Sequence, residues 1–295
     1  MNYVITGSLG HISKPIVQKL AKAGHSVTVI TSKPDNAAPI QKLGAKAAVG
    51  SVEDANFLIQ SFAGADAVYL MIPPKWGVTD WRYYQNKVAD NYTAALQANH
   101  IPYAVVLSSV GAHMGNGAGP VDGLHDLEQK LKILEDLNVK ILRPSYFMEN
   151  LFGMAGMVKG MGIMGSNFGD EKIVLVHTSD IAAAALQNLM NLDFAGHQVQ
   201  YIASDERTGA DIARVLGEAV GKPETPWMVF SDEQSKQGML QAGLNEEMAN
   251  GYTTMGLALR NGTMQEDYFA NRPATLGKVK LEDFAKNEFA PAFEG

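Results

Sequence analysis

The first fifteen residues decide the fold: Tyr3-Val4-Ile5-Thr6 is an apolar run, and Gly7-Ser8-Leu9-Gly10-His11-Ile12-Ser13 follows it directly. The run predicts a strand, and the spacing of Ile16, Val17 and Leu20 predicts a helix after the turn. Glycine is needed where φ is positive or where a Cβ would hold a ligand off the backbone. A helix that starts at such a turn presents free N–H groups and the positive end of its dipole, which suits a pyrophosphate. The stretch therefore predicts a dinucleotide-binding turn, and a strand-to-helix turn without a ligand is the alternative.

The composition excludes several kinds of function. The chain has 295 residues, of which 46% are hydrophobic, so it can bury a large core. The net charge of −7 argues against nucleic acid or an anionic membrane as a partner. The absence of cysteine removes disulfides, thiol nucleophiles and zinc–thiolate sites, and the seven scattered histidines suggest no metal site. We expect neither a membrane span nor a signal peptide, because no apolar run reaches eighteen residues and a strand begins at residue 3, and so we expect a cytoplasmic protein.

Short apolar strands alternate with helical patterns through the first 150 residues. We expect further strands at 26–30, 45–49, 67–72, 104–107 and 140–142, and helices at 36–43, 54–62, 79–99 and 122–137. This alternation predicts an α/β fold with a doubly wound parallel sheet, Rossmann-like, in which ligands bind at the carboxyl ends of the strands.

The pattern changes after residue 150. Residues 153–169 are rich in Gly and Met, which suits a pliable segment near a pocket or ordinary core filling. Residues 173–176 and 178–191 predict a strand and a helix that return to the main sheet. Helices expected at 209–220, 231–242, 246–258 and 280–288 predict a smaller, mostly helical substrate subdomain. We thus expect an NAD(P)-binding domain at 1–150 joined by 171–203, and a substrate-pocket subdomain at 151–170 and 204–295.

The end of the second strand bears on the choice of cofactor. It exits through Thr31-Ser32-Lys33, and no acidic residue stands at its tip to bind the ribose hydroxyls of NAD. Ser32 and Lys33 can bond a 2′-phosphate that a carboxylate would repel, which favours NADP(H). Asp35 lies two residues on and keeps NAD(H) open, and Lys33 is alternatively a solvated loop lysine.

The other expected cofactor contacts follow the remaining strands. They are Gly7, Ser8, Leu9, Gly10, His11 and Ile12 in the first turn, Ser51 and Val52 beside the adenine, Ile72, Pro73 and Pro74 beside the nicotinamide, and Ser108, Ser109, Pro144 and Tyr146 in the later loops.

Several segments, taken in order, resemble the NmrA-like branch of the atypical short-chain dehydrogenase/reductases. After the opening GSLGHIS turn they are GSVED (50–54), VLSSVG (106–111), HDLE (125–128), LRPSYFMEN (142–150), TSDIA (178–182) and TGADIA (208–213). The branch includes NADPH-dependent quinone and triphenylmethane-dye reductases and redox-sensing regulators. This chain departs from it at Ser13, where a third glycine is common, and at Ser51, where Asp is common.

The wider superfamily works with a tyrosine and a lysine four residues later, on the helix after Ser109. Here the residues at that spacing are His125 and Gln129, while Tyr83 and Lys87 share the spacing by chance on the preceding helix. The resemblance then implies hydride transfer to a quinone- or dye-like acceptor without a Tyr–Lys pair, because the cofactor carries the difficult step. A non-catalytic NADP(H)-sensing regulator is the alternative.

The candidate catalytic residue is His125, as a proton donor, although it could instead order the loop before its own helix. Candidate substrate contacts are His113, Phe147 and Asn150. The resemblance suggests that Glu149 and Asn150 shape the pocket, whereas the sequence alone reads them as a solvated first turn of a helix. We expect a small-molecule electron acceptor as the partner, no nucleic acid or membrane, and a monomer or homodimer.

Overall fold

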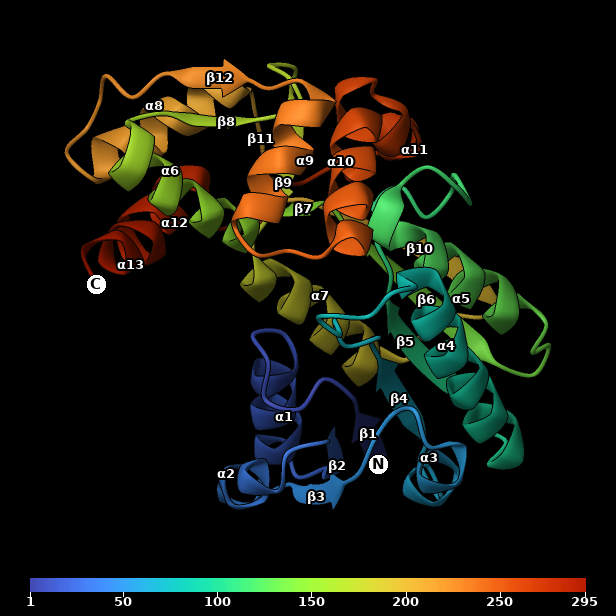
Figure 1. The fold of residues 1–295 in the computed structure, drawn as a ribbon. Coiled ribbons are helices and arrows are strands. Elements are labelled where there is room, and N and C mark those ends of the chain that lie inside the picture. Colours follow the sequence, from blue (N-terminus) through green and yellow to red (C-terminus); the bar gives the residue numbers. More distant parts are fainter.

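A computed structural model describes residues 1–295, which is the whole chain. Its centre is a seven-stranded sheet in the order β10-β6-β5-β4-β1-β2-β3, with all neighbours parallel (Figure 1). The strands are β1 (Asn2–Ile5), β2 (Ser26–Thr31), β3 (Lys46–Val49), β4 (Ala67–Leu70), β5 (Tyr103–Leu107), β6 (Asn138–Pro144) and β10 (His197–Ile202). The strand order reverses between β1 and β4, which is where a doubly wound sheet opens a crevice for a ligand.

Helices cover both faces of this sheet because successive side chains on each strand point to opposite sides. Tyr3 and Ile5 pack with α1 (Ser13–Lys22), α2 (Ala37–Lys42) and α7 (Thr178–Asn191). Val4 points the other way and packs with α3 (Ala55–Ser61), α4 (Trp81–Ala98) and α5 (Asp122–Lys132). Two single turns, η1 (Pro34–Asn36) and η2 (Gly119–Val121), precede α2 and α5. The predicted doubly wound α/β fold is confirmed.

The predicted return of residues 173–176 to the main sheet is wrong. Strand β9 (Ile173–Val176) instead lies between β11 (Asp205–Arg207) and β7 (Tyr146–Phe147) in a separate three-stranded sheet. The strand that extends the main sheet beyond β6 is β10, which was not among the expected strands. All four residues of β9 are buried, so its apolar run predicts burial without specifying the partner strands. Exposed Gln198 and Val199 make β10 a half-polar edge that lacks a strong strand signal.

The remaining elements build a mostly helical region toward one end of the main sheet (Figure 1). They are η3 (Met148–Phe152), α6 (Gly153–Met161), β8 (Met164–Ser166), α8 (Gly209–Ala219), β12 (Trp227–Val229), α9 (Asp232–Gln241), α10 (Glu246–Arg260), η4 (Thr263–Gln265), α11 (Glu266–Ala270), α12 (Leu281–Phe284), the π-helical η5 (Ala285–Phe289) and α13 (Ala290–Glu294). This region has its own apolar core, in which Met154 and Met164 are buried as core filling. The division into two domains stays a prediction. None of the helices combines the length and apolar character that a bilayer crossing requires.

Candidate functional site

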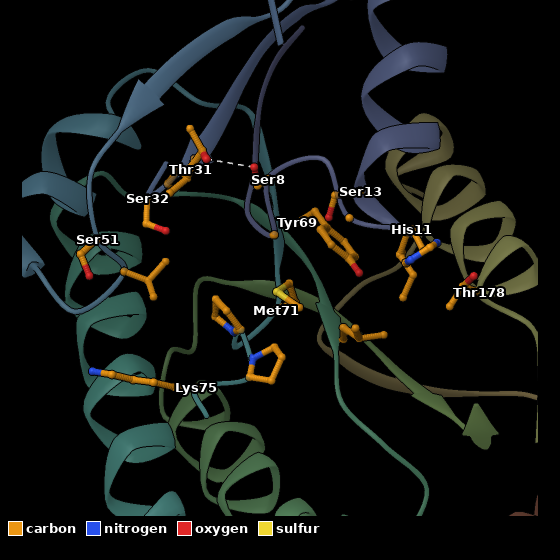
Figure 2. A pocket seen from close by; sticks show the side chains of 18 of the residues that line it. Ser8, His11, Ser13, Thr31, Ser32, Ser51, Tyr69, Met71, Lys75 and Thr178 are labelled. Carbon is orange, nitrogen blue, oxygen red and sulfur yellow. Dashed lines mark hydrogen bonds between the residues drawn. The ribbon is translucent and has the colours of Figure 1, made fainter. Parts of the chain in front are cut away.

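A cavity of about 640 Å³ opens where the strand order reverses (Figure 2). The predicted site residues on its wall are Gly7, Ser8, Gly10, His11, Ile12, Thr31, Ser32, Ser51, Val52, Pro73, Pro74 and Phe147. Glu149, which the resemblance suggested would shape the pocket, also lines it. The wall residues that were not expected as contacts are Ser13, Ile30, Gly50, Glu53, Tyr69, Met71, Lys75, Tyr84, Leu107 and Thr178. In Figure 2, Ser32, Ser51 and Lys75 lie on one side of the cavity, and His11, Ser13 and Thr178 lie on the other.

The opening turn has no room for larger side chains. Gly7 has φ +84°, and a Cβ added there would lie 2.6 Å from Ser13 Oγ. Ser13 Oγ donates a buried hydrogen bond of 2.8 Å to the carbonyl of Thr6, so this hydroxyl ties α1 to the end of β1 at the position where a third glycine was expected. Ile12 precedes α1, and no side chain caps that helix end. Lys14 N–H donates to the carbonyl of Gly10 at 3.0 Å and Pro15 has no N–H, so the N–H groups left for a ligand at this helix end are those of His11, Ile12 and Ser13.

The polar side of the cavity is held by a small hydroxyl network. Ser8 Oγ donates to Thr31 Oγ1 at 2.9 Å (Figure 2). Asn36 Nδ2 donates to Ser8 Oγ at 2.9 Å. The cation on this wall is Lys75, whose Nζ lies 2.6 Å from Glu53 Oε1. The hydrogen bond from Lys75 lowers the pKa of Glu53 below its usual value.

Two phenols also line the cavity, and Tyr84 lies next to Lys75, whose Nζ is 5.2 Å from the centre of the Tyr84 ring. Tyr84 donates to the carbonyl of Pro73 at 2.9 Å, and burial with a smaller effect of the Glu53 charge raises the pKa of Tyr84 to about 12. Tyr69 is fully buried, and its hydroxyl has no hydrogen-bond partner in the protein. Burial raises the pKa of Tyr69 far above its usual value, so this phenol stays a hydrogen-bond donor.

Several predicted residues do not lie on the cavity wall: Leu9, Lys33, Ile72, Ser108, Ser109, His113, His125, Pro144, Tyr146 and Asn150. Lys33 is exposed, and Asn150 is exposed as well. Strand β4 ends at Leu70 rather than at Ile72, so Met71 occupies the wall instead. Tyr146 packs edge-on against Phe168, with 5.9 Å between the ring centroids, at the apolar core of the mostly helical region.

His125 contacts the loop before its own helix, as its alternative role predicts. Its Nδ1 lies 2.7 Å from the carbonyl of Ala112, in the loop before its own helix. Its Nε2 faces Gly115 in the same loop, 3.2 Å from where a Cβ at Gly115 would stand. The role of His125 as a proton donor stays a prediction. Tyr83 is 71% exposed and Lys87 pairs with Glu53, so neither stands at the apolar wall.

Ser108 takes part in a buried ionic network instead of lining the cavity. Ser108 Oγ donates to Glu128 at 2.5 Å, and Arg143 binds both oxygens of Glu128 at 3.0 and 2.6 Å. The other end of Arg143 reaches Tyr201 at 2.9 Å and Asp267 of α11 at 3.0 Å. Burial opposes the charge of Arg143, but the hydrogen bonds and charge of Glu128 outweigh it and raise the pKa of Arg143. This network ties β6 to the helical region.

A second cluster joins three side chains that are far apart in the sequence. Glu149 accepts hydrogen bonds from Thr178 N–H at 3.2 Å and from the Thr178 hydroxyl, at the start of α7. His177 Nε2 lies 2.7 Å from Glu288 Oε1 and 3.8 Å from Glu149 Oε1. One side-chain atom from each of Glu149, His177 and Glu288 lies within 4.8 Å of the other two. No local sequence signal predicts this meeting, although the LRPSYFMEN and TSDIA segments contain two of its members.

The family model described as NAD(P)H-binding matches residues 7–191. NAD(P)H azoreductase of Xenophilus azovorans is 23% identical over 276 residues, which cover 94% of this chain and 92% of that protein. The structure of Citrobacter sp. triphenylmethane reductase complexed with NADP(H) has a TM-score of 0.81 at 18% identity, covering 96% of this chain and 99% of that one. The Escherichia coli NADPH-dependent quinone oxidoreductase complexed with NADPH has a TM-score of 0.78 at 19% identity, covering 97% and 99%. These structures share the fold described above.

Proposed function

Because the chain belongs to the NAD(P)H-binding family, we propose that it is a reductase that transfers hydride from NADPH to flat, electrophilic acceptors such as quinones or dyes. The observation that carries this proposal is the cavity itself. It is bordered by the uncapped end of α1 and by apolar side chains that include Met71, Leu107 and Phe147. The names of the azoreductase, triphenylmethane reductase and quinone oxidoreductase support this class of acceptor.

The cofactor lies along the cavity in one direction. The pyrophosphate binds the N–H groups of His11, Ile12 and Ser13, which have no partner in the protein and lie where the helix dipole favours negative charge. The adenosine end points to Ser32 and Ser51, and the nicotinamide points to the apolar wall. Lys75 rather than Lys33 supplies the cation for a 2′-phosphate, because Lys75 lines the cavity and Lys33 does not.

Hydride transfer to such acceptors asks mainly for orientation. A preformed apolar wall that holds a planar acceptor against the nicotinamide supplies proximity and excludes water. The position of the superfamily tyrosine and lysine is occupied by His125 and Gln129, so the tyrosine mechanism of alcohol dehydrogenases and epimerases is not available on α5.

The test is NADPH oxidation, followed by the loss of reduced-nicotinamide absorbance, with a panel of quinones, azo dyes and cationic triarylmethane dyes. Thermal-shift titrations with all four nicotinamide forms accompany it. We expect steady turnover with at least one acceptor class and stronger stabilisation by NADPH than by NADH. Binding of NADPH without turnover of any acceptor would contradict a reductase.

A second candidate is a non-catalytic NADP(H) sensor. The engagement of His125 with the Ala112 carbonyl favours it, since that leaves the usual helix without a free acid–base group at the cavity. It predicts cofactor binding that distinguishes oxidised from reduced forms and no oxidation of NADPH with any acceptor.

A further inference from the structure

We propose that Glu149 donates the proton that must accompany hydride in the reduction of a quinone, and that His177 and Glu288 reload it from solvent. This inference rests on the proposed reductase function. It adds a proton source at the cavity, where the superfamily tyrosine has no counterpart.

Glu149 is placed to deliver a proton into the cavity that it lines. Its Oε1 is satisfied by the N–H and hydroxyl of Thr178, whereas its Oε2 is buried and has no hydrogen-bond partner in the protein. A buried carboxylate oxygen without a partner is costly when charged. A proton on this carboxyl removes that charge, and a turn of the carboxyl group that brings the protonated oxygen to the cavity makes it a donor toward a bound acceptor.

The route from solvent to Glu149 passes through one imidazole nitrogen. His177 is 8% exposed, and its Nε2 lies 2.7 Å from Glu288 Oε1, while the Glu288 side chain is 39% exposed. The same Nε2 lies 3.8 Å from Glu149 Oε1, beyond hydrogen-bond length, so a side chain must move before a proton passes between them. His177 Nδ1 lies 2.7 Å from Ser179 Oγ. Nδ1 also caps α7 by accepting the N–H of Ser179 at 3.2 Å. The relay therefore uses the other tautomer, in which Nδ1 releases that N–H and carries a proton toward the Ser179 hydroxyl; Nε2 can then accept a proton from Glu288 and pass it to Glu149.

The step balances with NADPH as the reductant. The C4–H bond of the reduced nicotinamide breaks, and the hydride with both electrons adds to the quinone, which becomes a hydroquinone anion. The O–H bond of Glu149 breaks and its proton goes to the quinone oxygen, giving hydroquinone and NADP⁺. A cationic triarylmethane dye differs because hydride alone converts it to the neutral leuco form. The dye needs no proton.

This difference between acceptors gives the experiment. We would measure kcat at saturating NADPH with a quinone and with a cationic triarylmethane dye, in Glu149→Gln, His177→Asn and Glu288→Gln. Asparagine can still cap α7 through its side chain, so His177→Asn removes the relay and keeps the cap. Glu294→Gln, at an exposed glutamate near the C-terminus, is the matched control, and His125→Asn tests the other candidate donor.

We expect Glu149→Gln to lower kcat with the quinone by about 100-fold, the size of a general-acid contribution, and to leave the dye rate unchanged. The two relay variants should lower the quinone rate less, because water can reload Glu149 slowly, and should also spare the dye. Added acetic acid should restore quinone turnover to Glu149→Gln in proportion to its concentration. If the wild type reduces the quinone but not the dye, the two acceptors cannot be compared, and the rescue by acetic acid becomes the deciding test. Failure of that rescue overturns the proposal.

Other outcomes overturn the proposal as clearly. Equal losses with quinone and dye would make Glu149 a residue that positions the cofactor, and no loss with either would remove its role. A quinone-selective loss in His125→Asn but not in Glu149→Gln would move the donor to His125. Quinone activity that EDTA abolishes and Zn²⁺ restores would make the cluster a metal site. A wild type that reduces neither acceptor refutes the proposed function itself, which is distinct from all of these results.

Discussion

The hydroxyl of Tyr69 offers a test in which two measurements should move in opposite directions. Tyr69 is fully buried on β4, its ring lies beside the cavity, and its hydroxyl has no partner in the protein (Figure 2). Tyr69→Phe removes that hydroxyl without changing the packing of the ring. A bound dinucleotide brings hydrogen-bond acceptors into the cavity, so the hydroxyl that is unsatisfied in the empty protein gains a partner in the complex.

The hydroxyl of Tyr69 should therefore affect the stability of the empty protein and the affinity for NADPH in opposite ways. An unsatisfied buried hydroxyl costs about 1–3 kcal/mol, so Tyr69→Phe should stabilise the empty protein by about 1 kcal/mol. The same variant loses a hydrogen bond worth about 0.5–1.5 kcal/mol in the complex, which raises the Kd for NADPH by roughly 3- to 10-fold.

Urea unfolding of the empty protein and calorimetric titration with NADPH measure the two effects. Tyr92→Phe is the matched control, because the Tyr92 hydroxyl donates to the carbonyl of Met71 at 2.7 Å and Tyr92 does not line the cavity. That variant should destabilise the protein and leave the Kd unchanged. A loss of stability in Tyr69→Phe, or an unchanged affinity for NADPH, would refute the reasoning.

Three further predictions concern charge and packing. Lys75→Ala should weaken NADPH about tenfold more than NADH in calorimetric titrations, whereas Lys33→Ala should affect both alike; the reverse ranking would restore the role expected for Lys33 from the sequence. Ser13→Ala should lower the free energy of unfolding in urea by about 1–3 kcal/mol. In a Gly7→Ala background the loss should be much smaller, because the added Cβ already displaces the Ser13 hydroxyl from the carbonyl of Thr6. Additive losses would disprove this coupling. Arg143→Met leaves a buried glutamate without its cation and should cost about 3–5 kcal/mol by the same assay, and a cost below about 1 kcal/mol would show that this carboxylate is satisfied without it.

Most of the main sheet could be predicted because its strands are short apolar runs between helical patterns. The apolar runs predicted which strands are buried, but they did not predict which strands pair with one another. β9 is as apolar as an inner strand of the main sheet, yet its neighbours are β7 and β11. β10 extends the main sheet but carries exposed Gln198 and Val199, so it lacks the continuous apolar run that marks a buried strand.

The site was predictable where it is local in sequence. The turn from Gly7 to Ile12 and the polar tips at Ser32 and Ser51 follow directly from strand ends. Tyr69, Lys75 and Glu149 could not be placed in that way, because a side chain on a strand or in a loop reaches the cavity only through the tertiary packing.

The late position of β10 in the chain has a consequence for biosynthesis. Strand β6 pairs with β5 on one side and with β10 on the other, and β10 begins about fifty residues after β6 ends. While the nascent polypeptide is still emerging, β6 therefore presents an open edge to the crowded surroundings of the ribosome. A translational pause between these two strands would lengthen that exposure, and a holding chaperone would find its binding surface there.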